Sequence, residues 1–151
     1  MPLPFVPMEA PIFLKGRARR GPTLREAVLM HAVARLVLHP GIANIQTSWV
    51  KMGETGARIC LQSGANDLGG TLMNESISRA AGTQHGQELP PAAMRALIGS
   101  LGRVSEQRDT LYRPVSVDRQ RVAEGADELA PIVLTPPGSS SALSRHTIRI
   151  G

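Results

Sequence analysis

The sequence predicts an α/β fold, and more narrowly a piece of a (βα) barrel that is left with at least one unpaired strand edge. Strand-like and helix-like segments alternate with short connections, which is typical of a parallel sheet flanked by helices. Only two or three such strands are recognisable, whereas a complete eight-stranded barrel takes about 200–250 residues. Because the chain has 151 residues, we expect the barrel to be incomplete.

Composition narrows the class of protein without deciding its function. Hydrophobic residues make up 42% of the chain and aromatic residues only 3%, which predicts a core of aliphatic side chains. The net charge of +5 is compatible with nucleic acid, phosphate-bearing ligands or an anionic partner. A single cysteine excludes an internal disulfide, and no apolar run reaches the roughly 18 residues of a membrane span. The amino terminus lacks a signal-peptide pattern, so we expect a cytoplasmic protein.

The first long helix is predicted to begin after Thr23 and to end at residues 39–41, His-Pro-Gly. The segment before it holds a short apolar run at 3–8, which its two prolines restrict to an edge strand, and a basic loop at 15–21. The Thr23 hydroxyl and the Glu26 carboxylate have the spacing of a capping box. Apolar residues cover most of this helix, so it is expected to pack on more than one side. Its polar stripe consists of Arg25, Glu26, His31 and Arg35.

The later elements alternate between the periodicity of a strand and that of a helix. We expect a strand at 44–52, a short helix at 54–63, a strand at 66–73 and a short helix at 74–81. A longer helix opens at Pro90 or Pro91 and stops at Gly102. The pattern fades from Val115 onward, and a stretch rich in proline, serine and glycine predicts a largely disordered tail. The expected division is a partial barrel at 1–113 and a tail at 114–151.

Polar residues on the 44–52 strand suggest a ligand wall. Strand alternation puts Asn44, Gln46 and Ser48 on one face. Buried amides and hydroxyls are costly unless they are hydrogen-bonded, so a polar face inside a parallel sheet is unusual. It indicates either the lumen of a barrel that contacts a ligand or a satisfied polar ladder in the core.

The segment 64–76 reads as a strand that ends in small and polar residues and leads directly into a helix. In α/β proteins, ligands bind at this carboxyl end of a strand. Gly69 and Gly70 allow a ligand to approach the backbone, and Asn74 or Ser76 is placed to cap the next helix. Glu75 opposes an anion there, so a hydroxyl or ammonium ligand is as plausible; the alternative is an ordinary tight turn.

Metal binding, a catalytic triad and nucleic-acid binding find little support in the sequence. The four histidines and Cys60 show no metal-ligand spacing, and no catalytic triad is indicated. His31 is expected at a surface or an interface, whereas His85 lies in a polar loop beyond the strand end and is a candidate for substrate contact. The basic run at 15–20 has no interleaved aromatic residues, which disfavours nucleic-acid binding.

Two blocks of sequence carry a specific resemblance: NIQTSWVKMG at 44–53 and GANDLGGTLMNESISRAAGTQHGQELPP at 64–91. Weaker support comes from residues 11–36 and from QRDTLY at 107–112. Over most of its length the chain resembles the carboxyl-terminal part of the radical S-adenosylmethionine half of FO synthase, the 5-amino-6-(D-ribitylamino)uracil–L-tyrosine 4-hydroxyphenyl transferase. A menaquinone-pathway aminofutalosine synthase is a related alternative with less similarity.

This resemblance implies the carboxyl-terminal portion of a radical S-adenosylmethionine (βα) TIM-type barrel that acts in deazaflavin coenzyme biosynthesis. Family members use a [4Fe-4S] cluster and S-adenosyl-L-methionine to join a 4-hydroxybenzyl group from tyrosine to 5-amino-6-ribitylaminouracil. Their cluster is held by a CxxxCxxC motif, which this chain lacks. We therefore expect the isolated chain to be inactive. The expected partner is a missing amino-terminal barrel half or the cyclising half of FO synthase.

By match to the two blocks, the candidates for contact with substrate or S-adenosyl-L-methionine are Gln46, Ser48, Asn66, Asp67, Thr71, Asn74, Glu75 and His85. No catalytic residue and no metal ligand is assigned. Two other functions stay open at this point. One is a non-catalytic remnant that binds a nucleotide-like or flavin-like ligand, and the other is a basic nucleic-acid binder.

Overall fold

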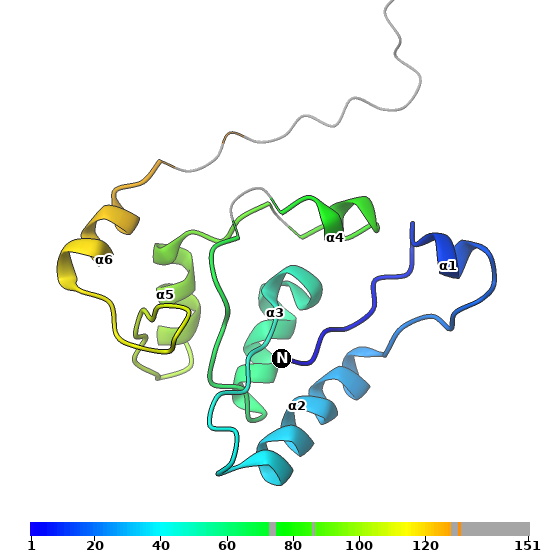
Figure 1. Cartoon of the computed structure of the whole chain (residues 1–151), viewed down its shortest axis with the longest axis horizontal. Coiled ribbons are helices and arrows are strands. Elements are labelled where there is room, and N and C mark those ends of the chain that lie inside the picture. Colours follow the sequence, from blue (N-terminus) through cyan, green and yellow to red (C-terminus); the bar gives the residue numbers. More distant parts are fainter. Residues whose placement is uncertain (73–74, 86, 128–129, 131–151) are drawn as a thin grey trace, which may run out of the picture.

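The computed structural model describes residues 1–72, 75–85, 87–127 and 130. Over these residues it is mostly helical, and it contains no strand longer than a single bridge (Figure 1). The helices are α1 (Pro11–Leu14), α2 (Leu24–Leu38), α3 (Trp49–Gln62), α4 (Ile77–Ala80), α5 (Pro91–Gly99) and α6 (Val117–Glu124). None of the helices in the described part of the chain is both long enough and apolar enough to span a membrane.

The longer helices pack in the order α2, α3, α5, α6, each against the next (Figure 1). The core lies where α3 and α5 meet the extended segments around residues 45 and 67. It is aliphatic apart from one tryptophan and one cysteine, as the composition predicts. Its buried members are Trp49, Val50, Ala57, Cys60, Leu61, Ala65, Leu68, Leu89 and Leu97.

The capping box of α2 is confirmed. The Glu26 amide donates to the Thr23 hydroxyl over 3.2 Å, and the Thr23 amide donates to the Glu26 carboxylate over 2.7 Å. The helix ends at His39, as predicted. Its predicted polar stripe, however, is divided: Arg25 and Glu26 are exposed, whereas the other two residues face the protein. His31 is fully buried and Arg35 is half-buried, so His31 is interfacial rather than exposed.

The strand expected at 44–52 is wrong beyond Ser48. Only residues 44–48 are extended, and the chain enters α3 at Trp49. Trp49 and Val50 are adjacent and both buried, an arrangement that a helix start permits and a strand with one buried face does not. The alternation that suggested a strand is short, and such short runs fit both periodicities.

A kink at Gly53 divides α3. Its backbone has φ of 66°, which L-residues rarely adopt, and the His85 ring occupies the space where a Cβ would lie. A Cβ atom at this position would come within 2.7 Å of His85 Cε1. The continuous helix after the kink corresponds to the short helix expected at 54–63, which is confirmed.

The second expected strand, 66–73, is reduced to one parallel bridge between Gln46 and Asp67. Beyond it the Thr71 carbonyl accepts a hydrogen bond from the Leu89 amide, so the chain pairs with a later loop. The short helix begins at Ile77 rather than at 74, and α5 ends before the predicted stop at Gly102. The sheet predicted from the sequence is therefore replaced, over the described residues, by two extended segments that share a bridge.

The region expected to be a tail contains α6. The Ser116 hydroxyl accepts from the Arg119 amide at its start, and Glu124 near its end pairs with Arg95 of α5. The proline- and serine-rich stretch from 131 onward lies outside the described residues.

Candidate functional site

The three segments that carry the resemblance meet at Asp67. We call Gln46, Asp67, Arg108 and Tyr112 the Asp67 cluster. Gln46 and Asp67 are the two bridged residues of the extended segments. Arg108 and Tyr112 come from the QRDTLY block, forty residues further along the chain. The pairing of the segments thus places polar side chains of distant blocks together.

The Asp67 carboxylate is surrounded by donors. Arg108 Nη2 lies 2.5 Å from Oδ2, and Gln46 Nε2 donates to the same oxygen over 3.1 Å. The other oxygen accepts from the Gly69 amide over 3.2 Å. Only 10% of the Asp67 side chain and 27% of the Arg108 side chain is exposed. Since both oxygens are engaged, this carboxylate holds Gln46, Arg108 and the Gly69 amide in place.

Arg108 also contacts Tyr112. Its guanidinium carbon lies 4.1 Å from the centre of the Tyr112 ring, a cation–π contact, while its Nε is buried and has no hydrogen-bond partner among the described residues. Tyr112 has φ of 61°, a left-handed conformation that non-glycine residues seldom adopt. Such backbone conformations persist only where the surroundings impose them.

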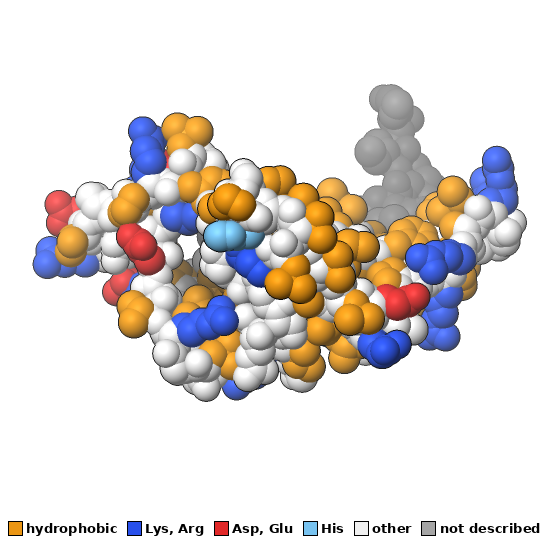
Figure 2. Space-filling model, turned by 90° about the horizontal axis from the view of Figure 1, so that it is seen from below, with side chains coloured by type: hydrophobic (Ala, Val, Ile, Leu, Met, Phe, Trp, Pro, Cys, Tyr) orange, Lys and Arg blue, Asp and Glu red, His pale blue; other side chains and the backbone are white. Residues whose placement is uncertain are grey.

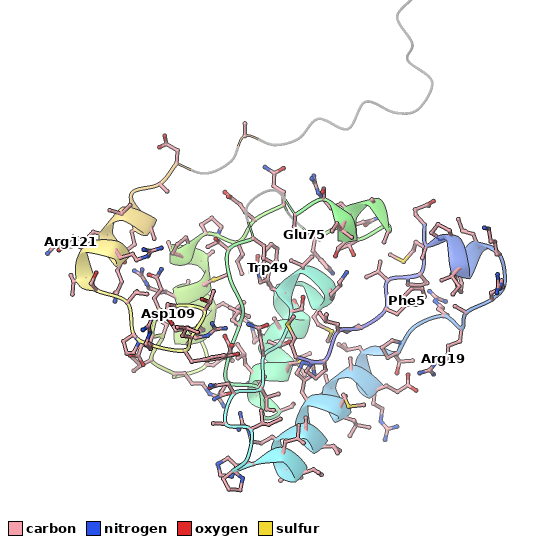
Figure 3. The ribbon with its side chains drawn as sticks, in the orientation of Figure 1. Phe5, Arg19, Trp49, Glu75, Asp109 and Arg121 are labelled. Carbon is pink, nitrogen blue, oxygen red and sulfur yellow. The ribbon has the colours of Figure 1, made fainter. Side chains whose placement is uncertain are left out.

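Asp109 imposes this conformation on the loop. Its carboxylate accepts hydrogen bonds from the amides of Leu111 and Arg113 and pairs with the Arg113 guanidinium. These interactions, led by the Arg113 amide, hold the pKa of Asp109 below its usual value. The loop is closed by an antiparallel bridge between Arg108 and Pro114. Figure 3 shows Asp109 on this loop and Trp49 at the start of α3.

Asn66 is not part of the Asp67 cluster. Its side-chain oxygen accepts from the Ile45 amide over 2.8 Å and from Arg35 Nη2 over 2.6 Å. Arg35 also donates to the carbonyls of Ala43 and Gly64. Asn66 and Arg35 together join α2 to both extended segments. This role is structural, and no sequence pattern predicts that a residue of α2 takes part in it.

The other candidates lie apart from Asp67 or serve local structure. Ser48 is buried at the start of α3, where its side chain makes no capping bond. Glu75 accepts from the Ser78 amide and so holds the start of α4, while Thr71 contributes the backbone carbonyl described above. Asn74 lies outside the described residues. His85 packs on Gly53.

His85 lines a hollow whose wall contains none of the residues of the Asp67 cluster. It lies between the amino-terminal segment around Phe5, the beginning of α2 and the loop at 82–85, with a volume of about 540 Å³. Most of its wall is apolar, and Lys51 and His85 provide nitrogen atoms. Lys51 Nζ contacts the Ser78 hydroxyl, so its ammonium group is already engaged. Figure 3 shows Phe5 on the segment that bounds this hollow.

The residues present do not fit an iron–sulfur cluster. The chain has one cysteine, and the described residues contain no group of three or more His, Cys, Asp or Glu side chains placed to hold a metal. Cys60 is fully buried in α3, and burial raises the pKa of its thiol, partly offset by the Thr47 hydroxyl. A thiol kept neutral in this way is a poor metal ligand.

Two residues of the site, Arg108 and Tyr112, were not among the candidates chosen from the sequence. They lie in a block that carried part of the resemblance, which was the available signal. What the sequence does not reveal is that a loop forty residues away returns to Asp67.

Comparisons with known proteins agree with these blocks. Residues 2–120 match the family model of the CofH/MqnC C-terminal region. The chain is 51% identical over 135 residues to an FO synthase of Streptomyces coelicolor, covering 87% of this chain and 16% of that protein. It is 49% identical over 112 residues to an FO synthase of Mycobacterium tuberculosis, covering 74% and 13%.

A third relative is shorter. The 5-amino-6-(D-ribitylamino)uracil–L-tyrosine 4-hydroxyphenyl transferase of Methanopyrus kandleri is 51% identical over 117 residues, which are 78% of this chain and 32% of that protein. The chain therefore spans a third or less of the length of these curated relatives. No solved structure matches significantly. The family match covers the extended segments, the Asp67 cluster and all six helices except the end of α6, and so this chain belongs to the family of CofH/MqnC C-terminal regions.

Proposed function

We propose that this chain forms the carboxyl-terminal part of a tyrosine 4-hydroxyphenyl transferase that acts in FO synthesis. The substrates would be L-tyrosine and 5-amino-6-(D-ribitylamino)uracil, as the name of the Methanopyrus relative states for that protein. The [4Fe-4S] cluster and S-adenosyl-L-methionine of radical S-adenosylmethionine chemistry would be bound by a part of the enzyme that this chain does not contain. On this proposal the chain is inactive alone.

The observation that carries the proposal is the Asp67 cluster. Residues from three separate blocks, each similar to FO synthases, converge on one partly buried carboxylate at the single parallel bridge. In (βα) barrels, residues just beyond the strands face the substrate. We propose that residues 1–113 are the last part of such a barrel and that Asp67 orients Gln46 and Arg108 at its rim.

Different roles follow for the remaining candidates. Arg108 pairs with Asp67, and the exposed 27% of its side chain would contact an anionic group of a substrate. His85 and the hollow beside Phe5 form a separate wall. Ser48, Thr71, Asn74 and Glu75 stay proposals as rim residues, although Glu75 already serves α4.

A chimera tests the proposal. The third of the Methanopyrus transferase that is similar to this chain is replaced by this chain, and product formation is assayed anaerobically with both substrates, S-adenosyl-L-methionine and a reductant. We expect the chimera to be active and the chain alone to form no product. A chimera that folds and holds its cluster but makes no product contradicts the proposal.

The role of the Asp67 cluster is tested in the same chimera. Arg108→Lys keeps the charge but loses the planar fork that engages Asp67 and stacks on Tyr112. We expect a rise in KM for one substrate with little change in iron content. The matched control is Arg121→Lys, since Arg121 is exposed on α6 and pairs with the exposed Asp118. Equal kinetics for both variants would remove Arg108 from the site.

A further inference from the structure

Helix α2 packs on the rest of the chain through a side that carries polar residues and exposes an apolar side, the reverse of an ordinary surface helix. The side that packs on the rest of the chain carries Ala27, His31 and Arg35, which recur at every fourth position. The opposite side carries five apolar residues, which we call the outer stripe of α2. It consists of Leu29, Met30, Val33, Leu36 and Val37. An amphipathic helix normally buries its apolar side.

The outer stripe is one continuous surface. At 100° per residue its five members fall within about a third of the helix circumference and extend over more than two turns. Leu36 is 81% exposed and Val37 is 72% exposed. Figure 2, which looks at the molecule from below, shows hydrophobic side chains gathered across this face. Contiguous apolar surface of this kind marks an interface.

The position of α2 in the row of helices indicates what covers it. In the order α2, α3, α5, α6, the inner side of α2 contacts α3, and α2 stands at the end of the row. If the row continues, the next helix must pack on the side of α2 that faces away from α3. The outer stripe lies on that side.

The first extended segment, which follows α2 in the chain, also has an open edge. Ile45 and Thr47 pair with the second extended segment through the Ile45 carbonyl and the Thr47 amide. The amide and carbonyl of Gln46 point to the opposite edge, because backbone groups alternate along an extended chain. Among the described residues, no backbone hydrogen bond uses them. A further parallel strand would find its partner there.

The relatives are longer than the part that matches this chain. The matching family is a carboxyl-terminal region, and the matched residues are only 32% of the Methanopyrus transferase, so most of that protein lies outside the matched part. We propose that the outer stripe of α2 and the open edge at Gln46 dock the strand and helix that come directly before this region in the longer enzyme. This inference rests on the proposed function.

The occupant is therefore a helix with a complementary apolar side, followed by or attached to a parallel strand. A second copy of this chain is disfavoured as occupant, since two outer stripes would meet without filling the edge at Gln46. The segment covers the same surface whether it belongs to the same polypeptide or to a separate one.

Binding in trans is the first test. The probe is the amino-terminal part of the Methanopyrus transferase, ending where its similarity to this chain begins, and association is measured by sedimentation velocity. We expect a one-to-one complex that Leu36→Glu and Val37→Glu each weaken at least ~10-fold. The matched control is Val104→Glu, since Val104 is 98% exposed and lies far from α2 in the sequence; it should bind like the unchanged chain.

The second measurement uses the chimera and needs no separate folding of either part. With p-benzoylphenylalanine in place of Leu36, photo-cross-links should map to the amino-terminal part by mass spectrometry; in place of Val104 they should not. Stripe variants that bind as tightly as the control, or a stripe that only joins two copies of this chain, overturn the inference. An inactive chimera with the expected cross-links would reject the proposed function but keep this surface.

Discussion

Asp67 joins parts of the chain that are distant in sequence, and its neighbours show how few side chains hold the site. The carboxylate links the first extended segment, through Gln46, to the loop that carries Arg108. It is mostly buried, so its hydrogen bonds are shielded from water. Charged hydrogen bonds in such surroundings contribute more than exposed ion pairs.

We expect Asp67→Asn to lower the free energy of unfolding by about 1.5–3 kcal/mol, because the Arg108 guanidinium loses its charged partner in a partly buried position. Urea unfolding followed by circular dichroism measures this change. Asp118→Asn is the control: Asp118 pairs with Arg121 at 3.6 Å and its side chain is 91% exposed, so its loss should stay within about 0.5 kcal/mol. Equal effects would mean that burial does not distinguish the two pairs.

Gly53 is a second residue on which the site depends. Gly53→Ala should destabilise the protein by more than about 1 kcal/mol, since the backbone has a positive φ and the His85 ring leaves no room for a Cβ. Gly99→Ala, in α5, meets nothing within 4 Å and should be neutral or mildly stabilising. Thermal unfolding of both variants compares them, and the result is contradicted if the two changes are alike.

At the scale of single elements, α2 combines a start that the sequence predicts with a packing side that it does not. The cap is local chemistry between Thr23 and Glu26, and it forms wherever that spacing precedes a helix. Which side of the helix is buried depends on the neighbours. Arg35 is drawn inward because its guanidinium satisfies carbonyls of the extended segments, a requirement that periodicity does not report.

Acid should weaken the start of α2. Hydrogen bonds from the Thr23 amide and hydroxyl favour the ionised form of Glu26, so its folded-state pKa lies below the ordinary value. Its contribution is complete above the ordinary pKa and is lost as the pH falls through the folded-state pKa. We expect Glu26→Gln to flatten the loss of helicity between about pH 5 and 3. Circular dichroism measures it; Glu9→Gln, outside every helix, should leave the acid sensitivity unchanged.

The extended segments and the site show which parts of the structure could be predicted from the sequence and which could not. The sequence predicts strands at 44–52 and 66–73, of which only 44–48 and the residues around Asp67 are extended, and one bridge places Gln46 beside Asp67. The first predicted strand is too long, because Trp49 and Val50 have strand propensity but are buried together at the start of a helix. Arg108 was missed because its contact depends on a loop that Asp109 closes, and no local pattern predicts a return over forty residues.

At the scale of the whole molecule, the chain has a core and yet leaves large apolar side chains on α2 in water. The row of helices has an open end, and the extended segments have an open edge. These features agree with a protein region that spans a third or less of its relatives.

The whole chain should fail to assemble an iron–sulfur cluster. After anaerobic incubation with iron and sulfide, followed by desalting, we expect far less than one cluster per chain, because the single thiol is buried and its pKa is raised. Iron content and absorbance measure this, with the full-length Methanopyrus transferase as the positive control. Iodoacetamide should react with Cys60 only after urea is added. A stoichiometric cluster on this chain would contradict the assignment of cluster binding to another part of the enzyme.

The chain's only tryptophan offers a built-in optical signal. Trp49 is 3% exposed, and its indole N–H donates to the Gly70 carbonyl over 2.9 Å, so the ring sits between the first turn of α3 and the glycine pair after the second extended segment. Its emission therefore reports on one junction, free of any other indole in the chain. A ligand or neighbouring segment that moves those glycines would change the colour or intensity of this emission, and titrations could be followed without attaching a dye.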